Sequence, residues 1–376
     1  MTTSSTSPAS AAGSGPSLRL ARLREEISRR EIGAIALSNP INVGYISGFT
    51  GSTATAVVTP TEAVFIADFR YALQAQSQCP EFHVRQCGPK PLETLADVVK
   101  ELGISTLHFE SATLTVAALE KWKEALPEIT LLPAADVVET LRQVKDAGEI
   151  AWIREAAVLA DRAFDFLLTI TRPGVREIDI AIELEYFLKK QGSEKEAFEI
   201  IVASGPRSAL PHGRASEKRL AGSHEVGRGE FVTFDFGACR GGYFSDLTRT
   251  IVLGKADDRQ REVYGIVAAA QQAALEAIRP GATGKEVDAK ARDLIAAHGF
   301  GENFGHGTGH GLGRLVHDHP GFSVHSELTL APGMVLTVEP GIYIEGWGGV
   351  RIEDDVLVTD TGCEILTSAP KHLIEL

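Results

Sequence analysis

The stretch that decides the fold is FVTFDFGACRGGYFSDLTRT, residues 231–250. Two strand-like apolar runs each carry one carboxylate, Asp235 and Asp246, and the segment 240–242 between them is typical of a turn. If the hairpin closes symmetrically between residues 240 and 241, the two carboxylates lie opposite each other. Like charges opposite each other on paired strands repel, and burial raises the cost. The sequence therefore predicts a group that neutralises both acids.

A second acidic pair lies in MVLTVEPGIYIEGWGGVRIEDDVLVT, residues 334–359. Glu339 and Glu353 are equidistant from Gly346, in a glycine-rich segment suited to a turn. Alternation along a strand places three polar side chains on one face, Arg351, Glu353 and Asp355, and the apolar Val350 and Ile352 on the other. The chain is thus predicted to set two acidic pairs opposite each other across two hairpins.

Histidines gather in FGHGTGHGLGRLVHDHP, residues 304–320. The glycines between His306 and His310 disfavour a helix, and in an extended segment both imidazoles face the same way. His212 stands apart in the loop-like SGPRSALPHG. Two acidic pairs with at least one histidine form a ligand set dominated by oxygen, which suits two divalent ions about 3.5–4 Å apart. Metal-assisted hydrolysis is the chemistry that this set predicts.

Composition excludes several other classes of protein. The chain has 376 residues, 44% of them hydrophobic, which favours two domains. A formal charge of −13 argues against nucleic-acid and anionic-membrane partners. No apolar run approaches the roughly 20 residues that span a bilayer, and the start lacks the features of a secretory signal. Four cysteines without a pairing pattern indicate reduced thiols and a cytoplasmic protein.

The pattern of elements changes along the chain. Residues 1–16 are predicted to be a disordered tail, 17–140 an α/β domain, and 141–376 an α+β domain. Apolar spacing predicts helices over 17–33 (with Ser17 as N-cap), 92–103, 114–126, 146–168, 177–192, 259–278 and 284–299. Apolar runs predict strands over 34–38, 53–59, 63–67, 106–110 and 198–204, besides those of the two hairpins.

Each feature also has a plainer explanation. Asp235 alone could bond to backbone amides or pair with Arg240 or Arg249. The acidic run 353–355 could be a solvated sheet edge. The glycine-rich histidine segment could cradle a phosphate, although it lacks the Lys–Ser/Thr ending of a P-loop. His108, His319, His325 and His372 are expected to be ordinary surface or core residues. Two acidic pairs, both symmetric about turns, are poorly explained in these ways.

Taken together, DFGACRGGYFSDLTRT, GHGTGHGLG, TVEPGIY and GGVRIEDDVLVT resemble the metal-dependent pita-bread peptidases: methionine aminopeptidase, aminopeptidase P and prolidase. IVASGPRSALPHG is similar to the Xaa-Pro branch, and YISGFTGSTATAVVT and VFIADFRYALQAQ resemble its creatinase-like N-terminal domain. The resemblance covers residues 18–376. It implies an α/β N-terminal domain followed by an α+β pita-bread catalytic domain.

The resemblance also implies roles for residues. The metal ligands would be Asp235, Asp246, His310, Glu339 and Glu353, holding two divalent ions, with Mn²⁺ favoured over Co²⁺ or Zn²⁺. Glu339 would be the general acid/base, His317 would contact the substrate carbonyl, and His212 would bond near the scissile amide. His306 and Tyr343 would support the ligands or line the pocket. Arg351 would support the Glu353 side or bind a substrate carboxylate.

The implied activity is that of an Xaa-Pro aminopeptidase acting on proline-containing peptides. A strict Xaa-Pro dipeptidase (prolidase) is the alternative, and a non-catalytic peptide-binding protein is a remote one. All five ligand positions match, which disfavours the metal-free creatinase chemistry. The N-terminal domain implies a homodimer. Phe304 and Trp347 are aromatic candidates for a proline pocket.

Overall fold

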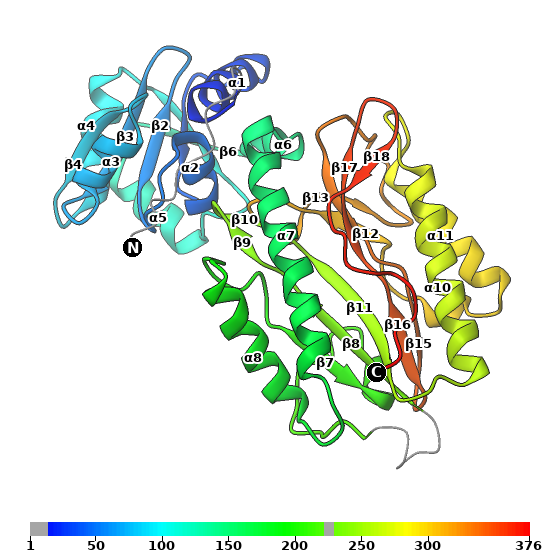
Figure 1. The fold of residues 1–376 in the computed structure, drawn as a ribbon. Helices are drawn as coiled ribbons and strands as arrows, with labels where there is room; N and C mark the ends of the chain where they lie inside the picture. Colours follow the sequence, from blue (N-terminus) through cyan, green and yellow to red (C-terminus); the bar gives the residue numbers. More distant parts are fainter. Residues whose placement is uncertain (1–13, 222–228) are drawn as a thin grey trace. The chain divides into compact units, whose positions relative to one another are not determined.

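The computed structural model describes residues 14–221 and 229–376 (Figure 1). The chain forms two compact units. One extends to Arg142 and includes Asp146–Gly148, and the other comprises Gln143–Lys145 and Glu149–Leu376. The domain limits at residues 17–140 and 141–376 stay predictions. The predicted tail, residues 1–16, lies mostly outside the described residues.

The first unit is an α/β layer structure built on one six-stranded sheet. The strand order is β4-β3-β2-β1-β5-β6, with β1–β2 and β2–β3 antiparallel and the other pairs parallel. Its strands are β1 (Ile35–Leu37), β2 (Thr55–Val58), β3 (Ala63–Asp68), β4 (His83–Cys87), β5 (Thr106–Glu110) and β6 (Thr130–Ala134). Its helices are α1 (Pro16–Arg29), α2 (Pro40–Ser47), α3 (Ala72–Gln78), α4 (Pro91–Glu101), α5 (Val116–Ala125) and α6 (Val137–Gln143).

The edges of this sheet are where the sequence pattern gives little signal. Strands β4 and β6 expose most of their side chains, so they lack the apolar runs that mark a strand in sequence. Pro133 lies in β6, where an edge strand tolerates its missing N–H. Helix α1 starts at Pro16 with Gly15 at the N-cap, so the prediction of Ser17 as the cap is wrong. Pro is favoured in the first turn because no N–H is needed there.

The second unit has the pita-bread arrangement, with strands in the middle and helices outside (Figure 1). Its helices are α7 (Ala147–Ile170), α8 (Glu177–Lys190), α10 (Asp258–Ala277) and α11 (Gly284–Ala297), with short 3₁₀ turns at Gly205–Ala209 and Gly301–Asn303. Its strands are β7 (Ile201–Ser204), β8 (Glu230–Phe236), β9 (Cys239–Arg240), β10 (Tyr243–Phe244), β11 (Leu247–Leu253), β12 (Gly309–Gly311), β13 (Asp318–Phe322), β14 (Val335–Val338), β15 (Gly341–Ile344), β16 (Gly348–Arg351), β17 (Asp354–Val358) and β18 (Cys363–Ile365).

Two large apolar cores and a smaller one hold the described part of this unit together. Helices α7 and α8 pack on β7, β8 and β11, and this core includes Phe164, Leu184 and Phe234. Helices α10 and α11 pack against β14 to β17 in a second core. Strands therefore approach the middle of the unit from both halves, with their polar faces free to form a site. Among the described residues, no helix combines the length and apolar character needed to cross a bilayer.

The first hairpin closes one residue later than predicted. Arg240 pairs with Tyr243 around Gly241–Gly242, and Thr248, not Asp246, lies opposite Asp235. Both glycines adopt positive φ (56° and 73°), which the tight turn requires and other residues resist. The expected pairing of the two acids is therefore wrong by two positions. A shift of two residues keeps the same face, because strand side chains alternate with period two.

The second hairpin closes as predicted, about Gly346. Gly341 pairs with Arg351, and β14 continues the same register with β17, so that Val338 pairs with Asp354. Glu339 and Glu353 thus occupy matching positions between these pairs. Gly346 has φ 70°, which suits a turn. The predicted face separation is confirmed, because Val350 and Ile352 lie in the apolar core.

Candidate metal centre

A cavity of about 490 Å³ in the second unit gathers most of the predicted site residues. Its walls come from the segment at the start of β7, the loop at 211–214, β8, the residue before β11, the segment around β12, and the second hairpin. Predicted residues that line it are Asp235, Asp246, Glu339, Glu353, His212, His306, His310, His317 and Arg351. Segments separated by more than 100 positions in sequence therefore meet at one place.

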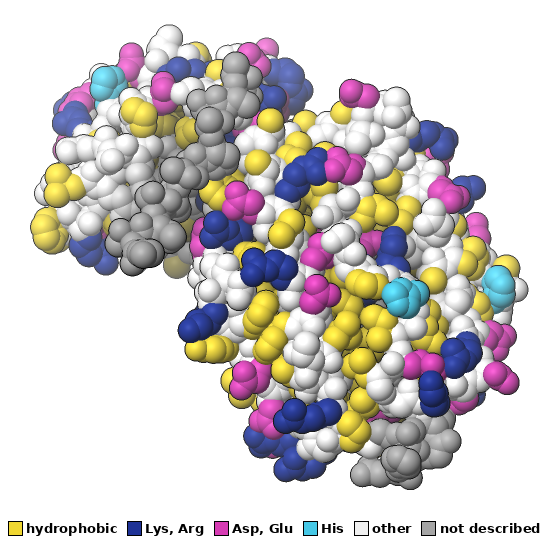
Figure 2. Space-filling model, in the orientation of Figure 1, with side chains coloured by type: hydrophobic (Ala, Val, Ile, Leu, Met, Phe, Trp, Pro, Cys, Tyr) yellow, Lys and Arg dark blue, Asp and Glu magenta, His cyan; other side chains and the backbone are white. Residues whose placement is uncertain are grey.

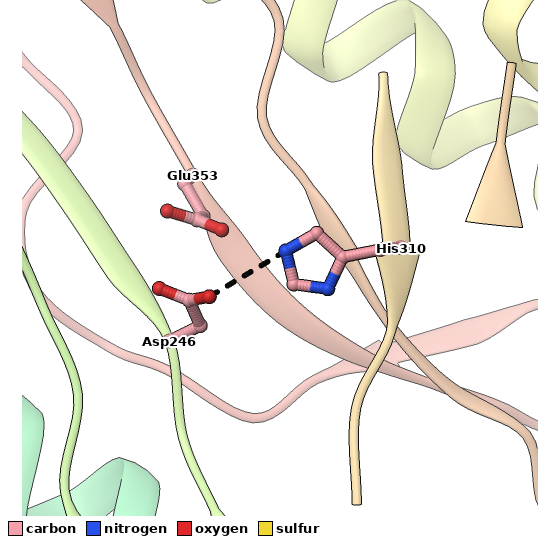
Figure 3. A group of neighbouring side chains, drawn as sticks. All are labelled: Asp246, His310 and Glu353. Carbon is pink, nitrogen blue, oxygen red and sulfur yellow. Dashed lines mark ion pairs between the residues drawn. The ribbon is translucent and has the colours of Figure 1, made fainter. Parts of the chain in front are cut away.

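Three side chains come together as a possible metal-binding group, Asp246, His310 and Glu353 (Figure 3). Each offers one ligand atom, and these atoms all lie within 4.8 Å of one another. His310 Nε2 lies 3.6 Å from Asp246 Oδ2 and 3.4 Å from Glu339 Oε1. Its Nδ1 lies 3.1 Å from the Gly311 carbonyl oxygen, which favours a proton on Nδ1 and leaves Nε2 to face the acids.

Several buried carboxylate oxygens in this cluster lack hydrogen-bond partners among the described residues. They are Asp235 Oδ1, Asp246 Oδ1, Glu353 Oε1 and Asp355 Oδ1. Buried polar atoms are nearly always paired, and an unpaired buried charge is costly. Divalent cations accept such oxygens as ligands. The residues present therefore fit a divalent metal centre.

Burial and mutual repulsion disfavour ionised acids here when no cation is bound. Burial, and then the neighbouring Glu353 and Asp235, raise the pKa of Asp246 well above its usual range. The pKa of Glu353 is also raised well above its usual range, first by burial and then by the neighbouring Glu339 and Asp235. Burial also raises the pKa of Glu339 and lowers that of His310. A bound cation would reverse these tendencies by favouring the ionised acids.

Arg351 is buried and makes contacts that the sequence did not specify. Its Nη2 lies 2.6 Å from Asp235 Oδ2, so its acidic partner is Asp235 and not Glu353. Its Nε donates to Thr248 Oγ1, which in turn donates to Glu353 Oε2. Its Nη1 donates to the Pro211 carbonyl and the Tyr343 hydroxyl. Arg351 is therefore bound on all sides by protein groups.

The simpler partners considered for Asp235 are wrong. Arg240 pairs with Glu155, and Arg249 pairs with the buried Asp354. The acidic run 353–355 is fully buried, so it is not a solvated edge. The phosphate-loop alternative is also disfavoured, because His310 in this segment faces carboxylates.

The other predicted residues divide into two groups. His212 and His317 are exposed at the cavity, and the ring centres of His317 and His310 lie 4.4 Å apart. His306 Nε2 lies 2.8 Å from the Tyr343 hydroxyl. Tyr343 does not line the cavity, and burial raises its pKa to about 12. Tyr343 thus links His306 to Arg351 behind the cavity wall.

The aromatic candidates for a proline pocket are wrong. Phe304 is buried beside Arg292, and Trp347 packs on Phe231, so both belong to the apolar core. The aromatic residue on the cavity wall is Phe198, just before β7. Its sequence signal was only that of a strand residue, which does not reveal the face of the sheet it occupies. Asp355 was placed on the correct face but given no role.

Comparison with known protein families finds matches over almost the whole chain. Residues 151–360 match the model of Metallopeptidase family M24, and residues 19–144 match that of the Creatinase/Prolidase N-terminal domain. The chain belongs to metallopeptidase family M24. M24 membership implies divalent metals, in agreement with the carboxylate and histidine cluster.

Individual M24 relatives align from end to end. "Uncharacterized peptidase YqhT" of Bacillus subtilis is 45% identical over 96% of this chain and all of its own length. The structure of "Xaa-Pro dipeptidase from Bacillus anthracis" has a TM-score of 0.93 and 46% identity, covering 96% of this chain and 100% of that one. The X-Pro aminopeptidase structure from Thermotoga maritima has a TM-score of 0.86 and 38% identity, covering 95% and 99%.

Proposed function

We propose that this protein is a dinuclear metal-dependent peptidase that hydrolyses the bond between an N-terminal residue and a following proline. The observation that carries the proposal is the set of unpaired buried carboxylate oxygens of Asp235, Asp246 and Glu353, which line one cavity with His310. Membership of family M24 supports metallopeptidase chemistry. Relatives named as Xaa-Pro dipeptidase and X-Pro aminopeptidase support the choice of substrate.

We assign the metal-binding role to five side chains: Asp235, Asp246, His310, Glu339 and Glu353. Two divalent ions bound there would acidify a water molecule and polarise the scissile carbonyl. Oxygen ligands with one imidazole suit Mn²⁺, with Co²⁺ and Zn²⁺ as rivals. Arg351 holds Asp235 by one oxygen and leaves the other unpaired, so Asp235 is oriented for this role.

Glu339 is the proton carrier in this proposal. Its carboxylate lies in the cavity, and Thr337 Oγ1 and His310 Nε2 lie 3.2 and 3.4 Å from its Oε1. It takes a proton from the attacking water and returns it to the departing proline nitrogen.

His212 and His317 bind the substrate at the mouth of the cavity. Burial, and then the neighbouring His310, lower the pKa of His317, which favours the neutral ring that donates one N–H to a substrate carbonyl. The amide before proline has no N–H, so recognition must depend on shape and on carbonyl contacts. Phe198 supplies an apolar surface for the proline ring.

Cellular context completes the proposal. The four cysteines are free thiols, which supports a reducing, cytoplasmic setting. Acidic and basic side chains are interspersed on the face shown in Figure 2, and the net charge is −13, so we expect no nucleic-acid partner. We propose a homodimer because the chain carries the creatinase-type N-terminal domain. Light scattering coupled to gel filtration would test it.

The deciding experiment uses protein stripped of metal and reloaded with Mn²⁺. Hydrolysis of an Xaa-Pro dipeptide is compared with that of an Xaa-Pro-Xaa tripeptide. Cleavage of the tripeptide establishes an aminopeptidase, and cleavage of the dipeptide alone establishes a strict dipeptidase. Metal binding without cleavage of either peptide would refute the proposal and favour a non-catalytic peptide-binding role.

A further inference from the structure

One ion pair on the cavity wall takes no part in the chemistry assigned above. Glu199 Oε2 and Arg214 Nε lie 2.9 Å apart, and both side chains line the cavity. They are largely exposed, at 60% and 79% of their side-chain surface. Exposed ion pairs contribute little to folding stability, since water solvates both charges when they separate. This pair can therefore open for a ligand at small cost.

The backbone fixes where Arg214 stands relative to the metal centre. Arg214 forms a bridge with Ile201, and Ile201 is the register partner of Asp235 in β8. Directly paired residues project from the same face of a sheet, and all three line the cavity. Adjacent strands are about 4.8 Å apart, which places the Arg214 backbone roughly 10 Å from that of Asp235. Glu199 lies two residues before Ile201, in the bend that precedes β7, and lines the same cavity.

This spacing lets the Arg214 side chain reach a group that lies one residue beyond the scissile bond. The α-carboxylate of an Xaa-Pro dipeptide lies one residue beyond the reacting carbonyl. An extended residue advances the chain by about 3.5 Å. The flexible Arg214 side chain spans the remaining distance from its strand. A third residue moves the carboxylate about 3.5 Å further from the reacting carbonyl.

Arg351 is unsuited to receive that carboxylate. It is the other arginine among the described lining residues, but it is buried and bonded to Asp235, Thr248, Pro211 and Tyr343. A substrate carboxylate could bind it only by breaking those bonds. Arg214 has no such cost, because its acidic partner is solvated at the rim.

We propose that Arg214 binds the free α-carboxylate of substrates that end at proline, and that Glu199 competes with this carboxylate for Arg214. The inference rests on the proposed Xaa-Pro peptidase function. The ion pair then sets the preference for chain length. Glu199 keeps the rim electrically neutral, so that longer peptides are also accepted. Arg214 retains the capacity to bind dipeptides.

The test compares Ala-Pro with its C-terminal amide, Ala-Pro-NH₂, on Mn²⁺-loaded enzyme. The two ligands have nearly the same shape and differ in one negative charge. We expect Arg214→Gln to raise KM for the acid by about three- to tenfold, the range for one accessible charge-assisted contact, with a much smaller change for the amide. Glu199→Gln should lower KM for the acid, because it removes the competitor.

The control is Arg279→Gln, which makes the same charge change at an exposed position outside the cavity lining. It should leave both KM values as in the wild type. Equal effects of Arg214→Gln on acid and amide, or no effect on either, would overturn the assignment. So would an increase in KM for the acid in Glu199→Gln. Cleavage of neither ligand by the loaded wild type would refute the proposed function itself.

Discussion

Replacing Asp246 by Asn should stabilise the metal-free protein while abolishing its response to metal. Ligand oxygens of Asp246 and Glu353 lie within 4.8 Å of each other. Two full charges at that distance repel by about 3 kcal/mol at an effective dielectric constant of about 20. The raised pKa values mean that the acids partly escape this cost by binding protons. We therefore expect a gain of about 1–3 kcal/mol at neutral pH, or about 2–12 °C in Tm for a unit of this size.

The sign of the pH dependence follows from the direction of the pKa shifts. A carboxyl group whose pKa is higher in the folded state than in the unfolded state contributes stability below its unfolded pKa. That stability is lost as pH rises through its folded pKa. The Tm of the metal-free wild type should accordingly fall as pH rises above about 4, and Asp246→Asn should fall less. At pH 4 or below the difference between them should vanish.

Differential scanning calorimetry of chelator-treated protein between pH 4 and 9, with and without Mn²⁺, measures these effects. Wild type should gain stability with Mn²⁺, because the ligand binds only the folded state. Asp246→Asn should gain little and should lack peptidase activity. Asp360→Asn, an exposed acid after β17, controls for the loss of one charge. A metal-free Asp246→Asn protein less stable than wild type at pH 8, or one with the full Mn²⁺ response, would refute the electrostatic reasoning.

Three further perturbations probe the support of the site. His212→Ala should keep bound metal, measured by elemental analysis, but lose most of its kcat on an Xaa-Pro substrate; an unchanged kcat would remove His212 from the mechanism. The buried Glu177 carboxylate accepts five hydrogen bonds from Ser204, Arg207 and Ser216, and these bonds hold the His212 loop. Glu177→Gln should therefore lower the free energy of unfolding in urea by about 2–4 kcal/mol and lower kcat. A stability within about 0.5 kcal/mol of wild type would contradict this. Gly241→Ala should destabilise the protein more than Gly242→Ala. Both glycines have positive φ, but only at Gly241 would a Cβ meet the Trp152 ring, at 2.4 Å. Equal losses of stability in the two variants would show that backbone strain alone decides.

Periodicity in the sequence predicts most of the interior of the fold. The helices now seen as α7, α8, α10 and α11 each bury an apolar stripe, and that stripe is visible in the chain. Edge strands β4 and β6 expose most of their side chains on both faces, so the sequence shows no apolar alternation that would mark them as strands. The centre of the first turn was displaced by one residue, because three consecutive residues, Arg240 to Gly242, all suit a turn.

The residues of the site were predictable from the sequence because the period-two alternation of a strand tolerates a shift of two positions. Asp235 and Asp246 remain on one face although they are not register partners. What local patterns could not give is contact between segments that are distant in sequence. The ion pair of Arg351 with Asp235 joins positions 116 apart.

The same limit applies to substrate recognition. Arg214, Ile201, Asp235 and Thr248 form one row of register partners across four segments, and only the folded sheet brings them into line. Asp235 and Thr248 hold the metal-centre end of this row, since Thr248 bonds Glu353 and Arg351. Arg214 ends the row at the rim. Chemistry and chain-length preference would then be set along a single line of paired strands, so a substitution at the rim can change specificity without disturbing the acids that bind metal.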